Sequence, residues 1–244
     1  MSQTIVIASG KGGVGKSTAS AALGRAFAAA GKKTLLIDCD AGLSSLDVML
    51  GVRDKVLFSW YDAYLGNCTA DEALIEAGEG LFLIAAPGLP LYEEAADAII
   101  KTTENLTEEF DVIIRDAPAG LGAGLVRAAS GAEMAVIVAT ADEVSVKGAA
   151  AVADMIRKNG VGNIRLLINR YDIKAAAKGK LLSVDELIDK SMVRLLGIIP
   201  EDKDIVYSTV TNIRKPNAKS AKAFIRTAQR LDGKNVDLIL SLLK

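Results

Sequence analysis

A glycine-rich segment near the start of the chain carries residue types that can hold a polyphosphate. The stretch Gly10-Lys11-Gly12-Gly13-Val14-Gly15-Lys16-Ser17-Thr18 satisfies the pattern G-x-x-x-x-G-K-[ST] and follows the apolar run TIVIA. Glycines let the backbone curl so that successive N–H groups face inward, and the positive N-terminal end of the next helix adds to the cradle. The spacing therefore predicts a phosphate-binding loop between a strand and a helix.

Three side chains at the end of this segment suit a nucleotide and its metal ion. Lys16 would neutralise the β and γ oxygens, Ser17 would supply a hydroxyl to Mg²⁺, and Thr18 is placed to contact the α-phosphate. The backbone cradle itself would consist of Gly12, Gly13, Val14 and Gly15. The alternative is a glycine-rich turn without a ligand, which the expected strand before it and the expected helix after it disfavour.

Composition narrows the chemistry that the remaining residues can do. The 244 residues include no histidine, which excludes histidine-based catalytic triads, histidine metal sites and imidazole pH switches. The net charge is only -1, so attraction to DNA or lipid would have to come from local patches. Cys39 and Cys68 alone build neither a four-cysteine zinc site nor a disulfide framework. Carboxylates, lysines and the backbone are left to do the chemistry.

Short apolar runs alternate with longer helical patterns along the chain, which is typical of a parallel sheet wrapped by helices. Seven runs are expected to be strands, starting at Thr4, Thr34, Leu81, Asp111, Ala135, Arg165 and Leu195. Helices are expected near residues 16–30, 91–108, 121–131, 143–159 and 218–232, with a capping box at 183–186 opening another. The fold class is α/β, with a mostly parallel twisted sheet of about seven or eight strands flanked by helices, the P-loop NTPase fold.

The chain is expected to form one ATPase domain over residues 1–235, followed by a short helical tail over 236–244. No linker, repeat or low-complexity tract divides it, and half of its residues are hydrophobic, enough for a sizeable core. It has no apolar stretch of about 18 residues and no pattern of a signal peptide. We expect a cytoplasmic protein.

The second lysine of the loop, Lys11, points to a particular family. The segment GKGGVGKST resembles the deviant Walker A loop of the MinD/ParA family, and the resemblance runs through nearly the whole chain, most closely to its MinD members. In that family this lysine reaches across a dimer interface to the partner's nucleotide. The resemblance therefore implies a homodimer that sandwiches ATP, with Lys11 as a catalytic residue beside Lys16. A solvated loop lysine is the alternative.

Two further segments resemble the switch regions of this family. Asp38-Cys39-Asp40-Ala41-Gly42-Leu43 looks like switch I, which implies that Asp40 orients the attacking water and that Asp38 lies near the Mg²⁺. DVIIRDAPAG, residues 111–120, reads as Walker B and switch II, which implies that Asp116 holds Mg²⁺ through water and that the Gly120 amide senses the γ-phosphate. Arg115 departs from the family, which usually has an apolar residue there. Aspartates that only cap turns are the alternative for switch I.

The resemblance also implies an adenine site. Asn169 would pair with the base edge, Arg170 would pack on the ring, and the backbone of Pro200 and Glu201 would line it. Asparagine as a simple turn residue is the alternative. In the segment TADE, Asp142 replaces the family's usual proline, which weakens the case for a ribose contact by Glu143 across the dimer.

Two surfaces could meet a partner. The first is a basic stripe on the helix near residues 218–232, where the helical residues span an arc of about 80°. Its members are Lys215, Lys219, Lys222, Arg226 and Arg230, opposite the apolar residues Ala221, Phe224, Ile225, Ala228 and Leu231. A stripe without acids suits a phosphate-rich surface, whether nucleoid DNA or anionic lipid, and an ordinary solvated surface is the alternative. The second is the tail 236–244, which is weakly amphipathic and either packs on the core or binds a membrane.

Three functions remain open. The first is a MinD-like ATPase, hydrolysing ATP to ADP and phosphate with Mg²⁺, that switches a dimer in placing the division septum. By resemblance, its partners would be a division inhibitor or an activator of the ATPase, with reversible association with the membrane. The second is a ParA-like or flagellar-number-type positioning ATPase that acts on nucleoid DNA or protein cargo. The third is a metal-cluster carrier or a metabolic P-loop enzyme. It ranks low because cluster carriers of this kind use paired cysteines, and the chain has none.

Overall fold

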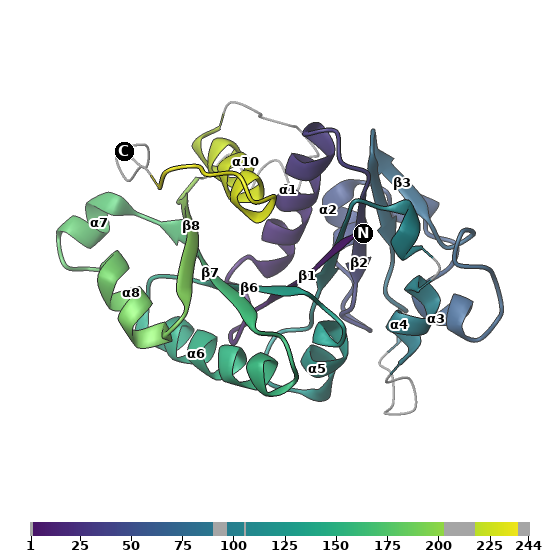
Figure 1. The fold of residues 1–244 in the computed structure, drawn as a ribbon, viewed down its shortest axis with the longest axis horizontal. Coiled ribbons are helices and arrows are strands. Elements are labelled where there is room, and N and C mark those ends of the chain that lie inside the picture. Colours follow the sequence, from purple (N-terminus) through teal and green to yellow (C-terminus); the bar gives the residue numbers. More distant parts are fainter. Residues whose placement is uncertain (1, 90–96, 105, 203–217, 239–244) are drawn as a thin grey trace.

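One sheet forms the centre of the molecule (Figure 1). The computed structural model describes residues 2–89, 97–104, 106–202 and 218–238. In this part of the chain the sheet has eight strands in the order β3-β4-β2-β5-β1-β6-β7-β8, and every neighbouring pair is parallel except β3 and β4. The strands are β1 Gln3–Ala8, β2 Thr34–Asp38, β3 Ile75–Gly78, β4 Leu81–Ile84, β5 Val112–Asp116, β6 Met134–Ala139, β7 Asn163–Tyr171 and β8 Arg194–Pro200.

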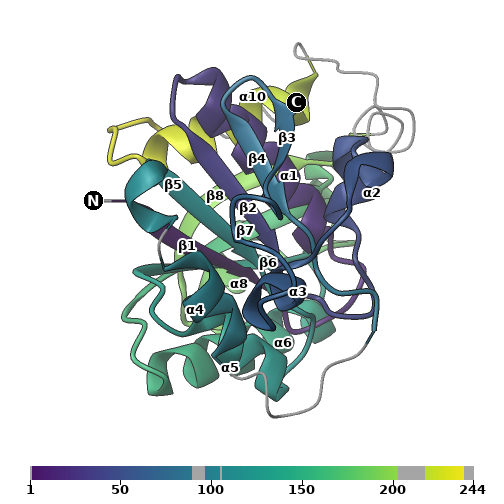
Figure 2. The same ribbon diagram turned by 90° about the vertical axis from the view of Figure 1, so that its right-hand side faces the viewer.

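Helices cover both faces of the sheet, as a parallel sheet with apolar residues on both faces requires (Figures 1 and 2). Buried side chains of α1, α2 and α10 form one core with the sheet, and those of α3, α4, α5, α6 and α8 form a second core on the opposite face. The helices are α1 Lys16–Ala29, α2 Leu46–Leu50, α3 Trp60–Tyr64, α4 Ala98–Thr103, α5 Ala123–Ala129, α6 Glu143–Lys158, α7 Ile173–Ala177, α8 Val184–Ser191 and α10 Lys219–Leu231. Two 3-10 turns, η1 Arg53–Lys55 and η3 Thr107–Glu109, complete the described elements.

The fold class is confirmed, and all seven expected strands are present in the sheet. The eighth strand, β3, was missed because it is a four-residue edge strand, IEAG, that pairs antiparallel with β4. Its single strongly apolar residue, Ile75, gives too little pattern to predict a strand.

The expected helices are present, although some are shorter than expected, and three five-residue helices were missed. The expected helix over 91–108 is only α4 and η3 within the described residues, since 90–96 and 105 lie outside them. Residues 183–186 do form a capping box, at the start of α8. The missed helices α2, α3 and α7 have five residues each, too few for a helical period, although Ser59 and Asp62 form a second capping box that was readable in the sequence.

The expected helical tail over 236–244 stays a prediction, since only its first three residues are described. Residues 234–238 carry no helix, and 239–244 lie outside the described residues. The Arg230 side chain donates to the backbone carbonyls of Val236 and Asp237, both at 2.7 Å, and so holds this segment beside α10. Within the described ranges, no helix is both long and apolar enough to cross a bilayer.

The strand order decides which residues meet. β1 lies between β5 and β6, and β5 lies between β1 and β2. The register pairs Asp116 of β5 with Ile7 of β1 and with Asp38 of β2. Because parallel strands end at the same edge of a sheet, the loop after β1 and these two aspartates come together at the carboxyl edge.

Candidate nucleotide-binding site

The loop between β1 and α1 has the backbone geometry of an anion cradle. Gly13 and Gly15 adopt positive φ angles of 76° and 90°, which L-residues with side chains rarely do. Gly15 is the N-cap of α1, and no side chain among the described residues caps the helix there. The first turn of α1 contains no acid, so its N–H groups and positive end are left for an anionic ligand.

Lys16 and Asp116 form a buried ion pair beneath this loop. The Lys16 Nζ lies 2.9 Å from Asp116 Oδ2 and 3.2 Å from Ser17 Oγ. Asp116 Oδ1 accepts a hydrogen bond from Ser20 Oγ at 2.6 Å, whereas its buried Oδ2 accepts none from the described residues. A polyphosphate and its cation would therefore replace each charge of this pair with another partner. The sequence analysis did not single out Ser20 as a site residue. Its position four residues after Lys16, on the same face of the helix, was the signal that could have indicated it.

Asp38 organises the loop that follows β2. Its Oδ1 accepts from the Asp40 amide at 3.0 Å, and its Oδ2 accepts from the amides of Ser45 and Leu46 at 2.9 and 3.1 Å. Burial and the nearby Asp116 carboxylate raise the pKa of Asp38, and these amides oppose the shift. Asp38 lies next to Asp116 in the strand register, and its carboxylate accepts hydrogen bonds from the loop.

Asp40 lies at the mouth of the site and is only partly buried. Burial, together with the nearby Asp116 carboxylate, raises the pKa of Asp40 above its ordinary value, although the Lys16 ammonium opposes this shift. A carboxylate so placed can hold a water molecule, and phosphoryl transfer depends more on such positioning than on a strong base.

The Gly120 amide does not stand free in this structure. It donates to the carbonyl of Ser9 at 3.0 Å, and Gly120 has a φ of 95°. A contact from this amide to a γ-phosphate would have to replace the Ser9 contact. That exchange is a two-position arrangement of the kind that nucleotide switches use.

Arg115, the departure in the strand before Asp116, is buried in the core. Its Nη1 donates to Ser130 O at 2.5 Å and lies 3.5 Å from Ala128 O, at the C-terminal end of α5. Burial lowers the pKa of Arg115. The positive charge therefore meets the negative end of a helix, and no acid among the described residues pairs with it.

Lys11 contacts an acid of its own protomer. Its Nζ lies 3.5 Å from Asp142 Oδ1, and both side chains are about half exposed. Asp142 also caps α6 through Ser145 and accepts from the Thr140 hydroxyl. Although burial alone would raise the pKa of Asp142, the Thr140 hydroxyl, the Ser145 amide and Lys11 together lower it. Next to it, Glu143 pairs with Lys190 at 2.9 Å.

Asn169 and Arg170 are brought to the loop from the end of β7. Asn169 Nδ2 donates to Val14 O at 2.8 Å, and Arg170 Nη2 donates to Gly13 O at 3.0 Å. Both residues therefore brace the loop, a role that the sequence did not reveal. Pro200 ends β8 and Glu201 donates its amide to Tyr171 O at 3.2 Å, so the expected base-lining segment lies beside the end of β7.

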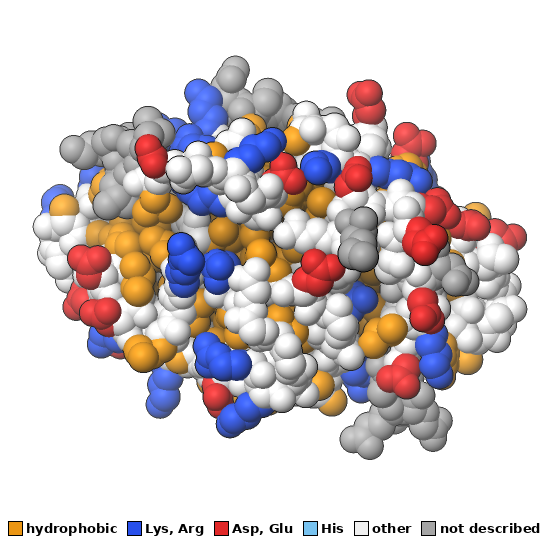
Figure 3. Space-filling view, viewed as in Figure 1, with side chains coloured by type: hydrophobic (Ala, Val, Ile, Leu, Met, Phe, Trp, Pro, Cys, Tyr) orange, Lys and Arg blue, Asp and Glu red, His pale blue; other side chains and the backbone are white. Residues whose placement is uncertain are grey.

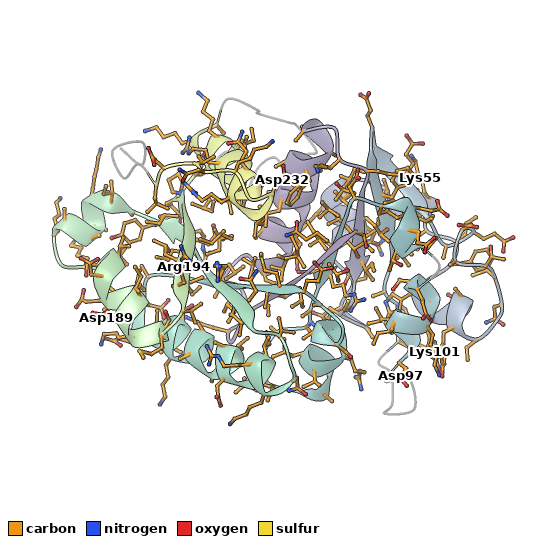
Figure 4. All side chains as sticks on the ribbon, in the orientation of Figure 1. Lys55, Asp97, Lys101, Asp189, Arg194 and Asp232 are labelled. Carbon is orange, nitrogen blue, oxygen red and sulfur yellow. The ribbon has the colours of Figure 1, made fainter. Side chains whose placement is uncertain are left out.

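The basic stripe on α10 is smaller than expected. The Arg230 guanidinium donates to the carbonyl of Leu196 in β8 and to the carbonyl of Val236. Arg230 is therefore engaged with the backbone and adds little to the basic stripe. Ile225, expected in the core, is 41% exposed, and Lys215 lies outside the described residues. Lys219 and Lys222 are exposed and Arg226 is partly so. Figure 3 shows Lys and Arg side chains among apolar ones over β8 and α10, and Figure 4 places Arg194 on β8.

Both cysteines are free thiols in this structure. Cys39 is buried and its burial raises the pKa of the thiol, while Cys68 lies elsewhere and is also a free thiol. The described residues contain no group of three His, Cys, Asp or Glu side chains that could hold a metal ion.

Sequence comparison with known proteins agrees with this geometry. The family model described as the CobQ/CobB/MinD/ParA nucleotide binding domain matches residues 5–214. The septum site-determining protein MinD of Synechocystis sp. is 35% identical over 248 residues, covering 98% of this chain and 92% of the relative.

Solved structures agree over the same length. The MinC:MinD cell division protein complex of Aquifex aeolicus contains a chain that is 32% identical, with a TM-score of 0.90 and coverage of 98% of both chains. The septum site-determining protein MinD of Pyrococcus horikoshii, complexed with Mg-ADP, is 29% identical, with a TM-score of 0.81 and coverage of 95% of this chain and 96% of the other.

Proposed function

This chain belongs to the CobQ/CobB/MinD/ParA nucleotide-binding family, and from that premise we propose that it is a MinD-like ATPase that acts in placing the division septum. It hydrolyses ATP to ADP and phosphate. The observation that carries the proposal is the buried pair of Lys16 and Asp116 beneath a helix N-terminus that no side chain caps. The lysine suits a phosphate and the aspartate suits a cation. The MinD relatives support the biological role.

The nucleotide lies along the loop between β1 and α1. Lys16 leaves Asp116 for the β and γ oxygens, and the hydroxyls of Ser17 and Thr18 meet the metal and the α-phosphate. The phosphate cradle is the backbone of Gly12, Gly13, Val14 and Gly15. Adenine is lined by Asn169, Arg170, Pro200 and Glu201. One amide hydrogen of Asn169 is donated to the Val14 carbonyl. Its second amide hydrogen and its Oδ1 remain able to hydrogen-bond to the edge of the adenine base.

Mg²⁺ fits the oxygens at this site. Asp116 Oδ2 is buried without a hydrogen bond from the described residues, and Ser17 Oγ lies near the same lysine. Ser17 would bind the ion directly, Asp116 through water, and Asp38 from farther out. Bound there, Mg²⁺ supplies charge neutralisation for the β and γ oxygens. The Mg-ADP complex of the Pyrococcus horikoshii relative supports this assignment.

Asp40 and Gly120 act on the γ-phosphate end. Asp40 orients the attacking water, and the Gly120 amide exchanges Ser9 for a γ-phosphate oxygen. Loss of the γ-phosphate then returns the amide to Ser9, so hydrolysis resets the loop.

Dimerisation would place two such sites face to face. Lys11 leaves Asp142 and reaches the partner's nucleotide, which makes ATP part of the interface. Loops at the carboxyl edge of the sheet and the first turn of α6 carry exposed apolar side chains that a second copy could cover, namely Leu43, Leu89 and Leu121 in the loops and Val144 in α6.

The target of the ATP-bound dimer is a protein, and a membrane surface is a second contact. The complex of MinD with MinC from Aquifex aeolicus supports a protein partner. A ParA-like role on DNA is favoured by one observation, the exposure of Lys219 and Lys222 with Arg226 on α10.

Loop variants test the ATPase and the dimer. Lys16→Ala should lose nucleotide binding or turnover in a phosphate-release assay, because it removes the ammonium that contacts the β and γ oxygens from within the loop. Lys11→Ala should bind ATP but stay monomeric in sedimentation velocity. Lys158→Ala, on the exposed outer side of α6, is the matched control. Undiminished hydrolysis by the first variant would refute the site, and an unchanged ATP-dependent dimer in the second would refute the role of Lys11.

Sedimentation of Asp40→Ala, which should be trapped with ATP, tests the target surface. It is spun with anionic liposomes and with duplex DNA, and ADP is the control in each. Pelleting with liposomes alone supports the MinD-like role. Pelleting with DNA alone, abolished by Lys222→Ala with Arg226→Ala, moves the protein to the ParA-like role. Binding to neither leaves a protein as the target.

A further inference from the structure

The only tryptophan of the chain contacts the switch I segment from a distant helix. Trp60 begins α3, and its side chain is 2% exposed. The indole Nε1–H donates to the backbone carbonyl of Asp38 at 2.8 Å. Asp38 is the last residue of β2, two residues before Asp40, so this bond ends at the base of the loop that carries Asp40.

The position of Trp60 is fixed by two other elements. Its amide donates to Ala85 O, just after β4, at 3.1 Å, and the preceding residue, Ser59, bridges to Ala85. Its own carbonyl accepts from the Thr102 hydroxyl of α4 at 3.0 Å. The backbone of Trp60 is therefore tied to the sheet and to α4, and the indole reaches inward from there.

Asp38 passes this contact on to the loop. The same residue whose carbonyl accepts from Trp60 holds the amides of Asp40, Ser45 and Leu46 with its carboxylate. A shift of the Asp38 backbone would therefore move the whole hydrogen-bonded loop. The Asp40 amide donates to the Asp38 carboxylate, and the Asp40 carbonyl accepts from the Leu43 amide at 3.1 Å within the same loop.

We propose that Trp60 is a positioning residue for Asp40, and that its indole couples the α3–α4 pair to switch I. This rests on the proposed function, because it assumes that Asp40 orients the water that attacks ATP. α3 and α4 lie next to each other at one side of the molecule (Figures 1 and 2). The Lys101 ammonium of α4, labelled in Figure 4, lies 5.9 Å from the centre of the Tyr64 ring of α3. The chain thus places a buried donor under its catalytic loop from a surface element.

A kinetic test uses Trp60→Phe, which keeps an aromatic ring but removes the N–H donor. The kcat for ATP hydrolysis should fall about fivefold to tenfold, the effect of losing one hydrogen bond at a positioned group, while the KM for ATP stays nearly constant. Tyr61→Phe is the matched control, because it keeps the edge contact with Trp60 and should retain wild-type kcat. An unchanged kcat in Trp60→Phe, or a fall in ATP affinity as large as the fall in kcat, overturns the proposal.

A spectroscopic test needs no variant and so does not depend on the folding of Trp60→Phe. Wild-type emission, which comes from one tryptophan, should change when Mg²⁺ and a non-hydrolysable ATP analogue bind, and change less with Mg-ADP. Binding is measured separately by calorimetry. If the analogue binds and the emission stays constant, the coupling is refuted. If wild-type protein neither binds nor hydrolyses ATP, the proposed function fails instead.

Discussion

At the scale of single residues, the groups assigned to the proposed site already have partners within the chain. Lys16 is held by Asp116, Lys11 by Asp142, and the Gly120 amide by the Ser9 carbonyl. The buried pair resists ligand binding more than the exposed one, since a surface ion pair contributes little in water. Under the proposed function, binding of ATP would require these groups to exchange their present partners for the nucleotide.

Gly15 tests whether the loop is shaped by its glycines. A Cβ there would lie 2.3 Å from Asn169 Nδ2, and its φ of 90° is strained for any side chain. Gly15→Ala should lower ATP affinity at least about tenfold in calorimetry, because the loop must move away from Asn169. Gly31→Ala is the control: its φ is 82°, and no described atom lies within 4 Å of a Cβ there, so it should lose stability but keep ATP affinity. Equal ATP affinity in the two variants would contradict this view.

Asp142 should oppose dimerisation if Lys11 has to leave it. Asparagine caps helices as well as aspartate does, so Asp142→Asn should keep α6 intact while releasing Lys11. The ATP-dependent dimer should then tighten by up to about fivefold, since exposed ion pairs contribute about 0 to 1 kcal/mol. Sedimentation equilibrium measures the change, with Asp154→Asn on the outer side of α6 as control. A weaker dimer would show that Asp142 aids assembly instead.

At the scale of elements, short helices depend on their caps. α3 has only five residues, and Ser59 and Asp62 exchange hydrogen bonds at its start. So short a helix has no stability of its own and is held by this box and by packing against α4. The same box at Ser183 and Glu186 begins α8.

The cap of α3 should make stability depend on pH. The Ser59 hydroxyl, followed by its amide, holds the pKa of Asp62 below its ordinary value, although burial opposes this. A depressed folded-state pKa gives stability that is present above the unfolded-state pKa and lost as pH falls through the folded-state pKa. Urea unfolding should therefore show wild type to be more stable than Asp62→Asn near neutral pH, with the difference shrinking in acid.

Two variants complete this test. Ser59→Ala should cost about 1 kcal/mol near neutral pH, the usual effect of losing an N-cap. Asp71→Asn, an exposed acid in the same region, is the control and should leave the unfolding free energy unchanged. A difference between wild type and Asp62→Asn that persists undiminished in acid would argue against the role of the Asp62 charge.

At the scale of the whole molecule, the sheet separates two cores, and Arg230 joins the end of the chain to its edge. The guanidinium bonds to Leu196 O at 3.2 Å and to two carbonyls of the C-terminal segment. Nearby, Asp232 at the end of α10 pairs with Lys32, which follows α1 (Figure 4). The last helix is therefore fixed to both the sheet and α1.

Arg230→Met should free the C-terminal segment without touching the site. Chymotrypsin should cleave after the exposed Leu238 faster than in wild type, because the carbonyls of Val236 and Asp237 lose their donor. ATP binding should be unchanged. Arg226→Met, the same change one turn earlier on α10, is the control. Equal cleavage rates in wild type and Arg230→Met would show that other contacts hold the segment.

Much of the protein was readable from the sequence because the signals are local. The phosphate loop is a contiguous pattern, seven strands are contiguous apolar runs, and the long helices repeat every three or four residues. β3, α2, α3 and α7 were missed since four or five residues carry no such period. The helical tail stays a prediction, since its described part, residues 236–238, is too short to test a helical pattern.

Only the tertiary structure decided which distant residues meet. Asn169 is hydrogen-bonded to Val14, which lies 155 residues away in the sequence. The Ser20–Asp116 hydrogen bond joins residues 96 positions apart, and the Trp60–Asp38 bond joins residues 22 positions apart. These pairs depend on the strand order, which puts β5 and β6 beside β1, and on the register at the carboxyl edge. By itself, the sequence determined the chemistry that the residues can do. The sheet decided their partners, because a hydrogen bond depends on distance in space and not along the chain.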